Sequence, residues 1–201
     1  MTTVALILAA GFSTRMGQCK ASLPWGDRHT LLTYQIEQFL SVHVFPVVVL
    51  GQHNADPQTQ RLSDCAIAIN PDASRGKVSS ILTGLALLPT DTDALFISAV
   101  DQPRPAWIYQ TLLEAHAHAA DPPPITAPIK GDRLGHPLLF SQRLIPELQT
   151  IRENTLGLRA IVNRYFSQIQ TVTFDTDLIF QDLNTPERYR QSIAERAVQD
   201  F

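Results

Sequence analysis

Short uninterrupted apolar runs recur along the chain, separated by stretches of mixed character. Runs of this length without alternation are typical of strands buried on both faces, as in a parallel sheet. They occupy residues 4–8, 44–50, 66–69, 94–98 and 125–127. The pattern therefore predicts a sheet whose strands are mainly parallel.

The stretches between these runs carry apolar residues at the spacing of helix faces. The three clearest stripes are Leu32, Ile36, Phe39 and Leu40; Ile81, Leu85 and Leu88; and Ile108, Leu112 and Ala115. Spacings of three and four residues place such side chains on one face of a helix. Thr30 and Pro105 are suitable residues for helix starts. Strands that alternate with helices predict an α/β fold with right-handed crossovers.

The alternation of predicted strands and helices changes after the proline tract at residues 121–124. A strand, a loop, an apolar stretch and an alternating stretch follow at 125–127, 131–135, 137–140 and 169–174. We interpret this part as an antiparallel addition to the edge of the same sheet, so that residues 1–201 form a single domain. A last helix is expected from Pro186 towards Val198, with Thr185 as its N-cap.

Composition places the chain in the globular class and limits its partners. Hydrophobic residues make up 44% of the 201 residues and charged residues 17%, which suits a domain with its own core and argues against disorder. The formal net charge is −3 and no block of Lys or Arg stands out, so a nucleic-acid partner is not expected. Any anionic ligand must therefore be bound by local groups.

Neither the cysteines nor the first apolar run indicates export. Cys19 and Cys65 lie in no metal-ligand spacing, and two cysteines cannot form a framework of several disulfides. No basic residue precedes the run 4–8, and the run is too short to cross a membrane. We therefore expect a cytoplasmic protein with no membrane partner.

A glycine-punctuated loop follows the first predicted strand. It runs from Ala9 to Gly17, and Lys20 lies just beyond it. Glycines let backbone N–H groups approach a ligand closely, hydroxyls add hydrogen bonds, and the cations Arg15 and Lys20 match phosphate oxygens. The spacing fits neither a Walker A loop nor a dinucleotide-binding fingerprint. The residues alone leave two interpretations open, a cradle for a triphosphate or a structural turn.

A wider set of residues resembles the MobA-like NTP transferase family. The opening signature comprises Leu8, Ala9, Ala10, Gly11, Ser13, Arg15, Met16, Gly17 and Lys20. Leu23, Pro24 and Trp25 resemble the branch of that family that transfers cytidylyl groups to molybdenum cofactor. Further similar blocks follow in family order, at Asn70-Pro71, 76–85, Asp101-Gln102-Pro103, Gly135-His136-Pro137 with Phe140, and 182–187. Together they span nearly the whole chain.

The resemblance implies a three-layer α/β/α nucleotidyltransferase fold of Rossmann type and a defined set of site residues. Arg15, Lys20 and Asp101 would be catalytic, and Asp101 with Asp182 would hold a magnesium ion, Mg²⁺. Nucleotide binding would fall to Leu8, Ala9, Ala10, Gly11, Ser13, Arg15, Gly17, Lys20, Gly76, Ser79 and Ser80. For Asp182 the alternative is an acid that flanks a helix N-terminus without a metal role.

The same resemblance implies CTP as the donor and the phosphate of molybdopterin as the acceptor, with release of pyrophosphate. Cytosine is favoured because residues 76–80 lack the Gly-Pro-Leu-Ala-Gly sequence of members that use guanine. His136 is expected near the acceptor, or else as a plain turn residue. A molybdoenzyme or its chaperone would be the protein partner.

Other functions stay compatible with these residues. The related ones are guanylyl transfer to the same cofactor and nucleotidyl transfer to a sugar phosphate. A different one is a non-catalytic carrier of molybdenum cofactor. Lys20 and Asp101 argue against the carrier, because carriage needs neither a triphosphate cradle nor a metal carboxylate.

Overall fold

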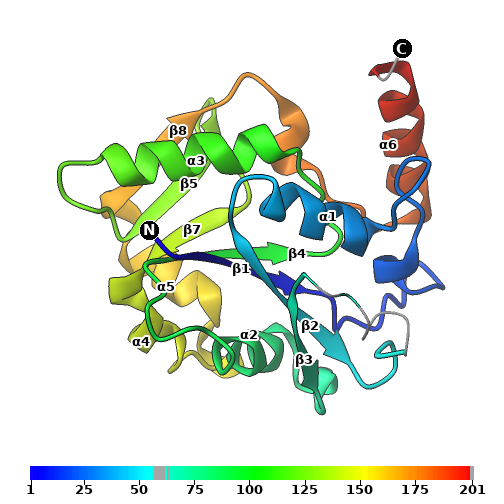
Figure 1. Cartoon of the computed structure of the whole chain (residues 1–201), viewed down its shortest axis with the longest axis horizontal. Helices are drawn as coiled ribbons and strands as arrows, with labels where there is room; N and C mark the ends of the chain where they lie inside the picture. Colours follow the sequence, from blue (N-terminus) through cyan, green and yellow to red (C-terminus); the bar gives the residue numbers. More distant parts are fainter. Residues whose placement is uncertain (57–61, 63, 200–201) are drawn as a thin grey trace.

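The fold is built around one mixed sheet (Figure 1). The structure, a computed structural model, describes residues 1–56, 62 and 64–199. At the centre of the sheet, β1 (Thr3–Leu8) lies between β2 (Phe45–Gly51) and β4 (Ala94–Ala99) and is parallel to both. β3 (Ala66–Asn70) extends this parallel part beyond β2. These strands coincide with the predicted apolar runs, and every residue of β1 is buried.

The other half of the sheet combines both strand directions. β7 (Leu138–Ser141) is antiparallel to β4 on one side and to β5 (Ile125–Lys130) on the other. β6 (Arg133–Leu134) pairs antiparallel with β5, whereas β8 (Ile169–Thr173) pairs parallel with it. An antiparallel addition is thus present, but its expected place at the sheet edge is wrong for β7, which lies inside the sheet. Its expected direction is wrong for β8. Side-chain alternation reports which faces are buried and says nothing of strand order.

Helices cover both faces of the sheet and complete three layers (Figure 1). One face carries α1 (Leu31–Leu40) and α3 (Ala106–His118), and the other carries α2 (Lys77–Leu85), α4 (Ile145–Leu148) and α5 (Leu158–Arg164). The α1 layer packs against Ile7 and Phe96, and the α2 layer packs against Leu6 and Leu95. Two separate apolar cores result, because successive strand side chains point to opposite faces. The predicted three-layer α/β fold is confirmed.

Local sequence explains where the helices begin and end. Thr30 starts α1 with a capping box, in which its hydroxyl accepts from the Thr33 N–H and the Thr33 hydroxyl accepts from the Thr30 N–H. Pro105 is the N-cap residue of α3, one position before the first helical residue. α2 ends at Leu85, so the stripe residue Leu88 lies beyond the helix.

The last helix, α6 (Pro186–Gln199), begins at the expected proline. The Thr185 hydroxyl accepts from the Arg188 N–H at 3.4 Å and so provides the expected cap. Tyr189 packs against the core on the α1 side and donates its hydroxyl to the Pro24 carbonyl at 2.5 Å. Within the described ranges, no helix has the length and apolar character needed to span a membrane.

Candidate active site

A cleft opens at the carboxyl ends of β1 and β4, the edge at which ligands of parallel α/β sheets bind. Its volume is about 370 Å³. The loop after β1, the start of α2, the turn after β4 and the segment before α6 meet there. The predicted residues that line it are Leu8, Ala10, Gly11, Ser13, Lys20, Gly76, Ser80, Asp101 and Asp182. The fold therefore brings together residues that are far apart in the sequence.

The glycine loop after β1 is anchored to the sheet and leaves open space on one side. The Ala9 N–H donates to a β2 carbonyl at 2.8 Å, and Asn54 Nδ2 donates to the Ala9 carbonyl at 2.8 Å. The Ser13 hydroxyl accepts from the backbone N–H of Lys20 at 3.2 Å, which closes the loop. A Cβ added to Gly11 would meet no heavy atom within 4 Å. The loop can therefore admit a ligand close to its backbone, as a phosphate cradle requires.

Lys20 connects three segments in the cleft. Its Nζ donates to Asp101 Oδ2 at 2.6 Å and to Asn184 Oδ1 at 2.7 Å. The Lys20 and Asp101 side chains are only 12% and 16% exposed, so this ion pair is less screened by water than a surface pair. Lys20 thus compensates the charge of Asp101 and links it to the segment before α6.

Asp182 lies beside this pair and has an oxygen without a partner. No hydrogen bond from the described residues reaches its buried Oδ1. Burial, and next the negative charge of Asp101, raise the pKa of Asp182. The Leu183 N–H donates to the Asp101 carbonyl at 2.9 Å, which ties the two acidic segments together. A buried carboxylate oxygen of this kind is suited to a cation.

The donor set of the cleft fits a hard divalent cation. Asp101, Asp182 and Asn184 offer carboxylate and amide oxygens, the ligand type that magnesium prefers. Magnesium also keeps several waters beside one or two carboxylates, so it needs no closed protein cage. In the part of the chain that the structure describes, no group of three or more His, Cys, Asp or Glu side chains is placed to hold a metal. The oxygens present would therefore suit a cation that completes its coordination with water or with ligand oxygens.

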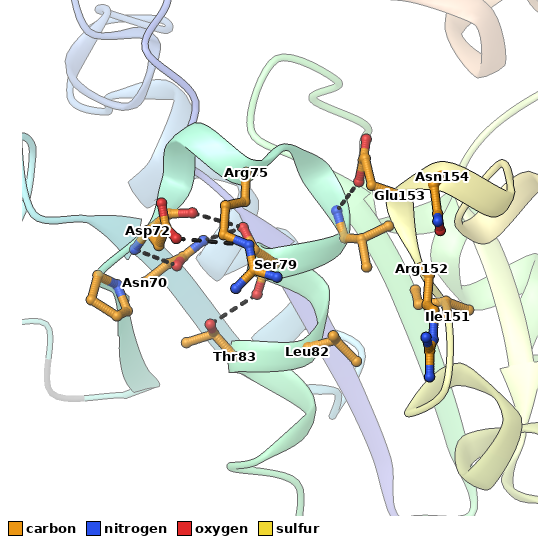
Figure 2. A pocket seen from close by; sticks show the side chains of 12 residues that line it. Asn70, Asp72, Arg75, Ser79, Leu82, Thr83, Ile151, Arg152, Glu153 and Asn154 are labelled. Atoms are coloured by element: carbon orange, nitrogen blue, oxygen red, sulfur yellow. Dashed lines mark hydrogen bonds and ion pairs between the residues drawn. The ribbon is translucent and has the colours of Figure 1, made fainter.

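The start of α2 is capped by a residue far away in the sequence. Gly76, the N-cap residue, has a φ of +97° and no side chain to offer. Instead, Glu153 Oε2 accepts from the Val78 N–H at 3.0 Å (Figure 2). A Cβ at Gly76 would lie 2.7 Å from Glu153 Cδ, so the close approach requires glycine. Asn70 Nδ2 donates to the Ser80 hydroxyl at 3.0 Å, and both contacts hold the α2 wall of the cleft in place.

Four predicted nucleotide-binding residues do not line the cleft. Arg15 and Gly17 lie in an exposed turn of the glycine loop, and Ala9 is buried beneath it. Ser79 accepts from Asn70 Nδ2 at 2.9 Å and lines a neighbouring cavity (Figure 2). Adjacent residues of a helix differ by about 100° in direction, so Ser79 and Ser80 face different spaces. The roles of these four residues in nucleotide binding stay predictions.

Other residues line the cleft without having been predicted. They are Ala73, Lys77, Ala99, Val100, Gln102 and Asn184. Each lies inside or beside one of the similar blocks, so adjacency to a block was the signal that could have found them. Lys77 and Asn184 matter most, because one adds a positive charge and the other an amide oxygen that accepts from Lys20.

His136 borders a second cavity beside the cleft. This cavity of about 400 Å³ lies between α2, α5 and the segment 134–138, and Lys77 lines both spaces. Although part of the His136 ring reaches solvent, partial burial and the positive charges of Lys77 and Arg104 lower its pKa to about 4. The ring is therefore neutral near pH 7.

Comparison with known proteins agrees with this architecture. A family model described as MobA-like NTP transferase domain matches residues 5–169. A molybdenum cofactor cytidylyltransferase of Escherichia coli (strain K12) is 26% identical over 188 residues, which cover 92% of each chain.

Two solved structures extend the similarity of fold over nearly the whole chain. Rv0371c from Mycobacterium tuberculosis H37Rv, in complex with manganese, has a TM-score of 0.76 at 18% identity and covers 96% of this chain and 99% of its own. A nucleotidyl transferase from Methanothermobacter thermautotroptrophicus has a TM-score of 0.77 at 20% identity, with 96% and 97% covered. The overall fold is thus shared with these solved structures, one of which is a nucleotidyl transferase.

Proposed function

This chain belongs to the MobA-like NTP transferase family and is a nucleotidyltransferase, and from that premise we propose that it transfers CMP from CTP to the phosphate of molybdenum cofactor, releasing pyrophosphate. The observation that carries the transfer chemistry is the convergence of the open glycine loop, Lys20 and two carboxylates on one cleft. The E. coli relative, a molybdenum cofactor cytidylyltransferase, supports the choice of base and acceptor. Cytoplasmic location and delivery to a molybdoenzyme or its chaperone belong to the same proposal.

The triphosphate would bind along the glycine loop, where Gly11 leaves room for it. Lys20 would exchange its contact with Asp101 for a phosphate oxygen and so compensate negative charge. Asp101 and Asp182, with the amide oxygen of Asn184, would hold Mg²⁺, which neutralises phosphate charge when bound. The acceptor phosphate is already an anion near neutral pH, so the residues need to position and compensate charge rather than supply a strong base.

The acceptor would occupy the second cavity, beside the donor site. Lys77 lines both spaces and can hold a phosphate at their boundary. Ile81 and Leu138 give the second cavity apolar walls, and the neutral His136 ring offers a hydrogen-bonding group. This combination suits an organic phosphate whose body has a flat or apolar face.

A matrix of substrates tests the proposal. Each of four nucleoside triphosphates is paired with molybdenum cofactor or with a sugar 1-phosphate in the presence of magnesium, and pyrophosphate release is measured. We expect release only from CTP with molybdenum cofactor. Release from GTP instead of CTP would mean that the donor base is guanine. Release only with the sugar 1-phosphate would mean that the acceptor is a sugar phosphate. Tight pterin binding without release from any nucleotide would indicate a carrier.

A further inference from the structure

Arg104 is a cation buried in the interior next to the cleft. Its side chain is 1% exposed, and it follows directly after the Asp101-Gln102-Pro103 block. None of the ion pairs among the described residues includes it. Burying a guanidinium is costly unless its N–H groups are hydrogen-bonded. The N–H groups of Arg104 must therefore donate to hydrogen-bond acceptors other than carboxylates.

Those partners are backbone carbonyls from separate segments of the chain. Arg104 Nε donates to the His136 carbonyl at 3.3 Å, and Nη1 donates to the neighbouring Pro103 carbonyl at 3.1 Å. Nη2 donates to the carbonyls of Ile179 at 3.1 Å and Gln181 at 2.7 Å. A planar guanidinium can reach several carbonyls at fixed angles, which a lysine ammonium on a flexible stem cannot reproduce.

The contacts of Arg104 join the two sides of the site. Gln181 directly precedes Asp182 of the cleft, whereas His136 borders the second cavity. The His136 N–H also donates to the Ile179 carbonyl at 2.9 Å, the same carbonyl that accepts from Arg104. A Cβ at Gly135 would lie 2.8 Å from that carbonyl oxygen, so the junction closes only because residue 135 is glycine.

We propose that Arg104 is a positioning residue that holds the segment 179–182 and the loop 135–136 in fixed places relative to Asp101, so that the cation site and the acceptor site form as one unit. The ligands named for these two sites rest on the proposed function. The junction itself does not, because its hydrogen bonds are independent of any ligand. Arg104 acts through Asp182 and His136 and makes no contact with substrate in this scheme.

The test replaces Arg104 and measures the junction without turnover. Arg104→Ala removes the guanidinium, Arg104→Lys keeps the charge without the planar fork, and Arg143→Ala is an exposed arginine control. We expect amide hydrogen exchange at Gly135, His136 and residues 179–183 to become roughly tenfold faster in Arg104→Ala, as loss of charged hydrogen bonds predicts. Manganese affinity should fall by a similar factor, and CTP affinity measured without metal should change less than about twofold.

Chemical rescue separates positioning from general stability. Free guanidinium at millimolar concentration should occupy the space left in Arg104→Ala and restore slow exchange and manganese affinity, and Arg104→Lys should show a smaller loss. Unchanged exchange in both variants would overturn the proposal, and so would faster exchange spread over the whole sheet without rescue. If Arg104→Ala does not fold, Arg104→Lys decides by the same exchange measurement. Absence of pyrophosphate release from the parent protein would refute the proposed function and leave this test intact.

Discussion

Lys20 shows how much of the site depends on one side chain. Its side chain is largely shielded from solvent, and its Nζ donates to Asp101, whose charge it compensates, and to Asn184. An ion pair shielded in this way is stronger than the exposed pairs elsewhere on the chain, such as that between Lys130 and Asp177. These two lysines therefore form a matched pair for mutation.

Lys20→Ala should lower the rate of pyrophosphate release by roughly a hundredfold to a thousandfold, by analogy with loss of one preorganised charge contact. Lys130→Ala removes an exposed ion pair outside the cleft and should keep the rate within about twofold. Steady-state kinetics measure both rates, and circular dichroism checks that both variants fold. Equal losses would contradict the assignment of Lys20 to the triphosphate site.

The lowered pKa of His136 predicts how the ring responds to pH. Because its pKa in the folded chain is about 4, the ring should stay neutral from about pH 7 to about pH 5.5, where an ordinary histidine takes up a proton. The unfolded chain takes up this proton at the ordinary pKa of 6.5, whereas the folded chain does so only at about 4. The contribution of His136 to the free energy of unfolding should therefore fall as the pH drops below 6.5, and it should not depend on pH above that value. The NMR shift of the His136 ring, assigned by comparison with His136→Asn, should stay constant over this interval. A midpoint near 6.5 would contradict the prediction.

The sequence identified three charged residues of the cleft, but it identified neither Lys77 nor the residues that hold the site in place. Lys20, Asp101 and Asp182 stand in recognisable blocks, so their types and order were informative. Arg104 and Glu153 bind backbone groups of distant segments, and a backbone carbonyl or N–H leaves no mark in the sequence. Their importance becomes visible only after the chain has folded.

At the scale of elements, glycines determine how closely α2 and the glycine loop can approach their neighbours. Gly84 faces the sheet, where an added Cβ would lie 2.0 Å from Leu6 Cδ1 and 2.8 Å from Val49 Cγ2. Gly11 has open space at the same position. Gly84 therefore allows α2 to pack closely against the sheet, whereas Gly11 keeps space open in the cleft.

This contrast predicts that substitution of glycine by alanine affects stability at one position and nucleotide binding at the other. Gly84→Ala overpacks the contact between α2 and β1 and should lower the free energy of unfolding by about 1–3 kcal/mol. Gly11→Ala should change it by less than about 0.5 kcal/mol but weaken nucleotide binding, because the added methyl group occupies the cradle. Urea unfolding and calorimetric titration with CTP measure the two effects. The reverse order of stabilities would contradict the packing of α2.

Element types were easier to predict than their arrangement. The apolar runs of β1, β2 and β4 report burial on both faces, and the structure confirms that they are parallel neighbours. The position of β7 between β4 and β5 depends on pairing between strands far apart in the sequence. Periodicity within a strand holds no information about that pairing.

At the scale of the whole molecule, the cleft gathers residues from the first β-strand to the segment before the last helix. Residues 8–20, 76–80, 101–102 and 182–184 all contribute, and the sheet brings them to one edge. The two apolar cores pack on opposite faces of the sheet and hold these segments in fixed positions relative to one another. The site is thus a property of the assembled sheet rather than of any one motif.

With Asp101 as a cation ligand and Lys20 as a phosphate ligand, the roles proposed above, their ion pair implies a coupling free energy between the two ligands. A cation that binds alone must compete with Lys20 for Asp101, whereas a triphosphate offers Lys20 another anion and frees the carboxylate. Each ligand should therefore raise the affinity for the other by the same factor, roughly fivefold to a hundredfold. Calorimetric titration of manganese with and without CTP measures this factor. Lys20→Ala should bind manganese more tightly in the absence of CTP and lose most of the coupling, so the parent chain selects the metal–nucleotide complex over either component.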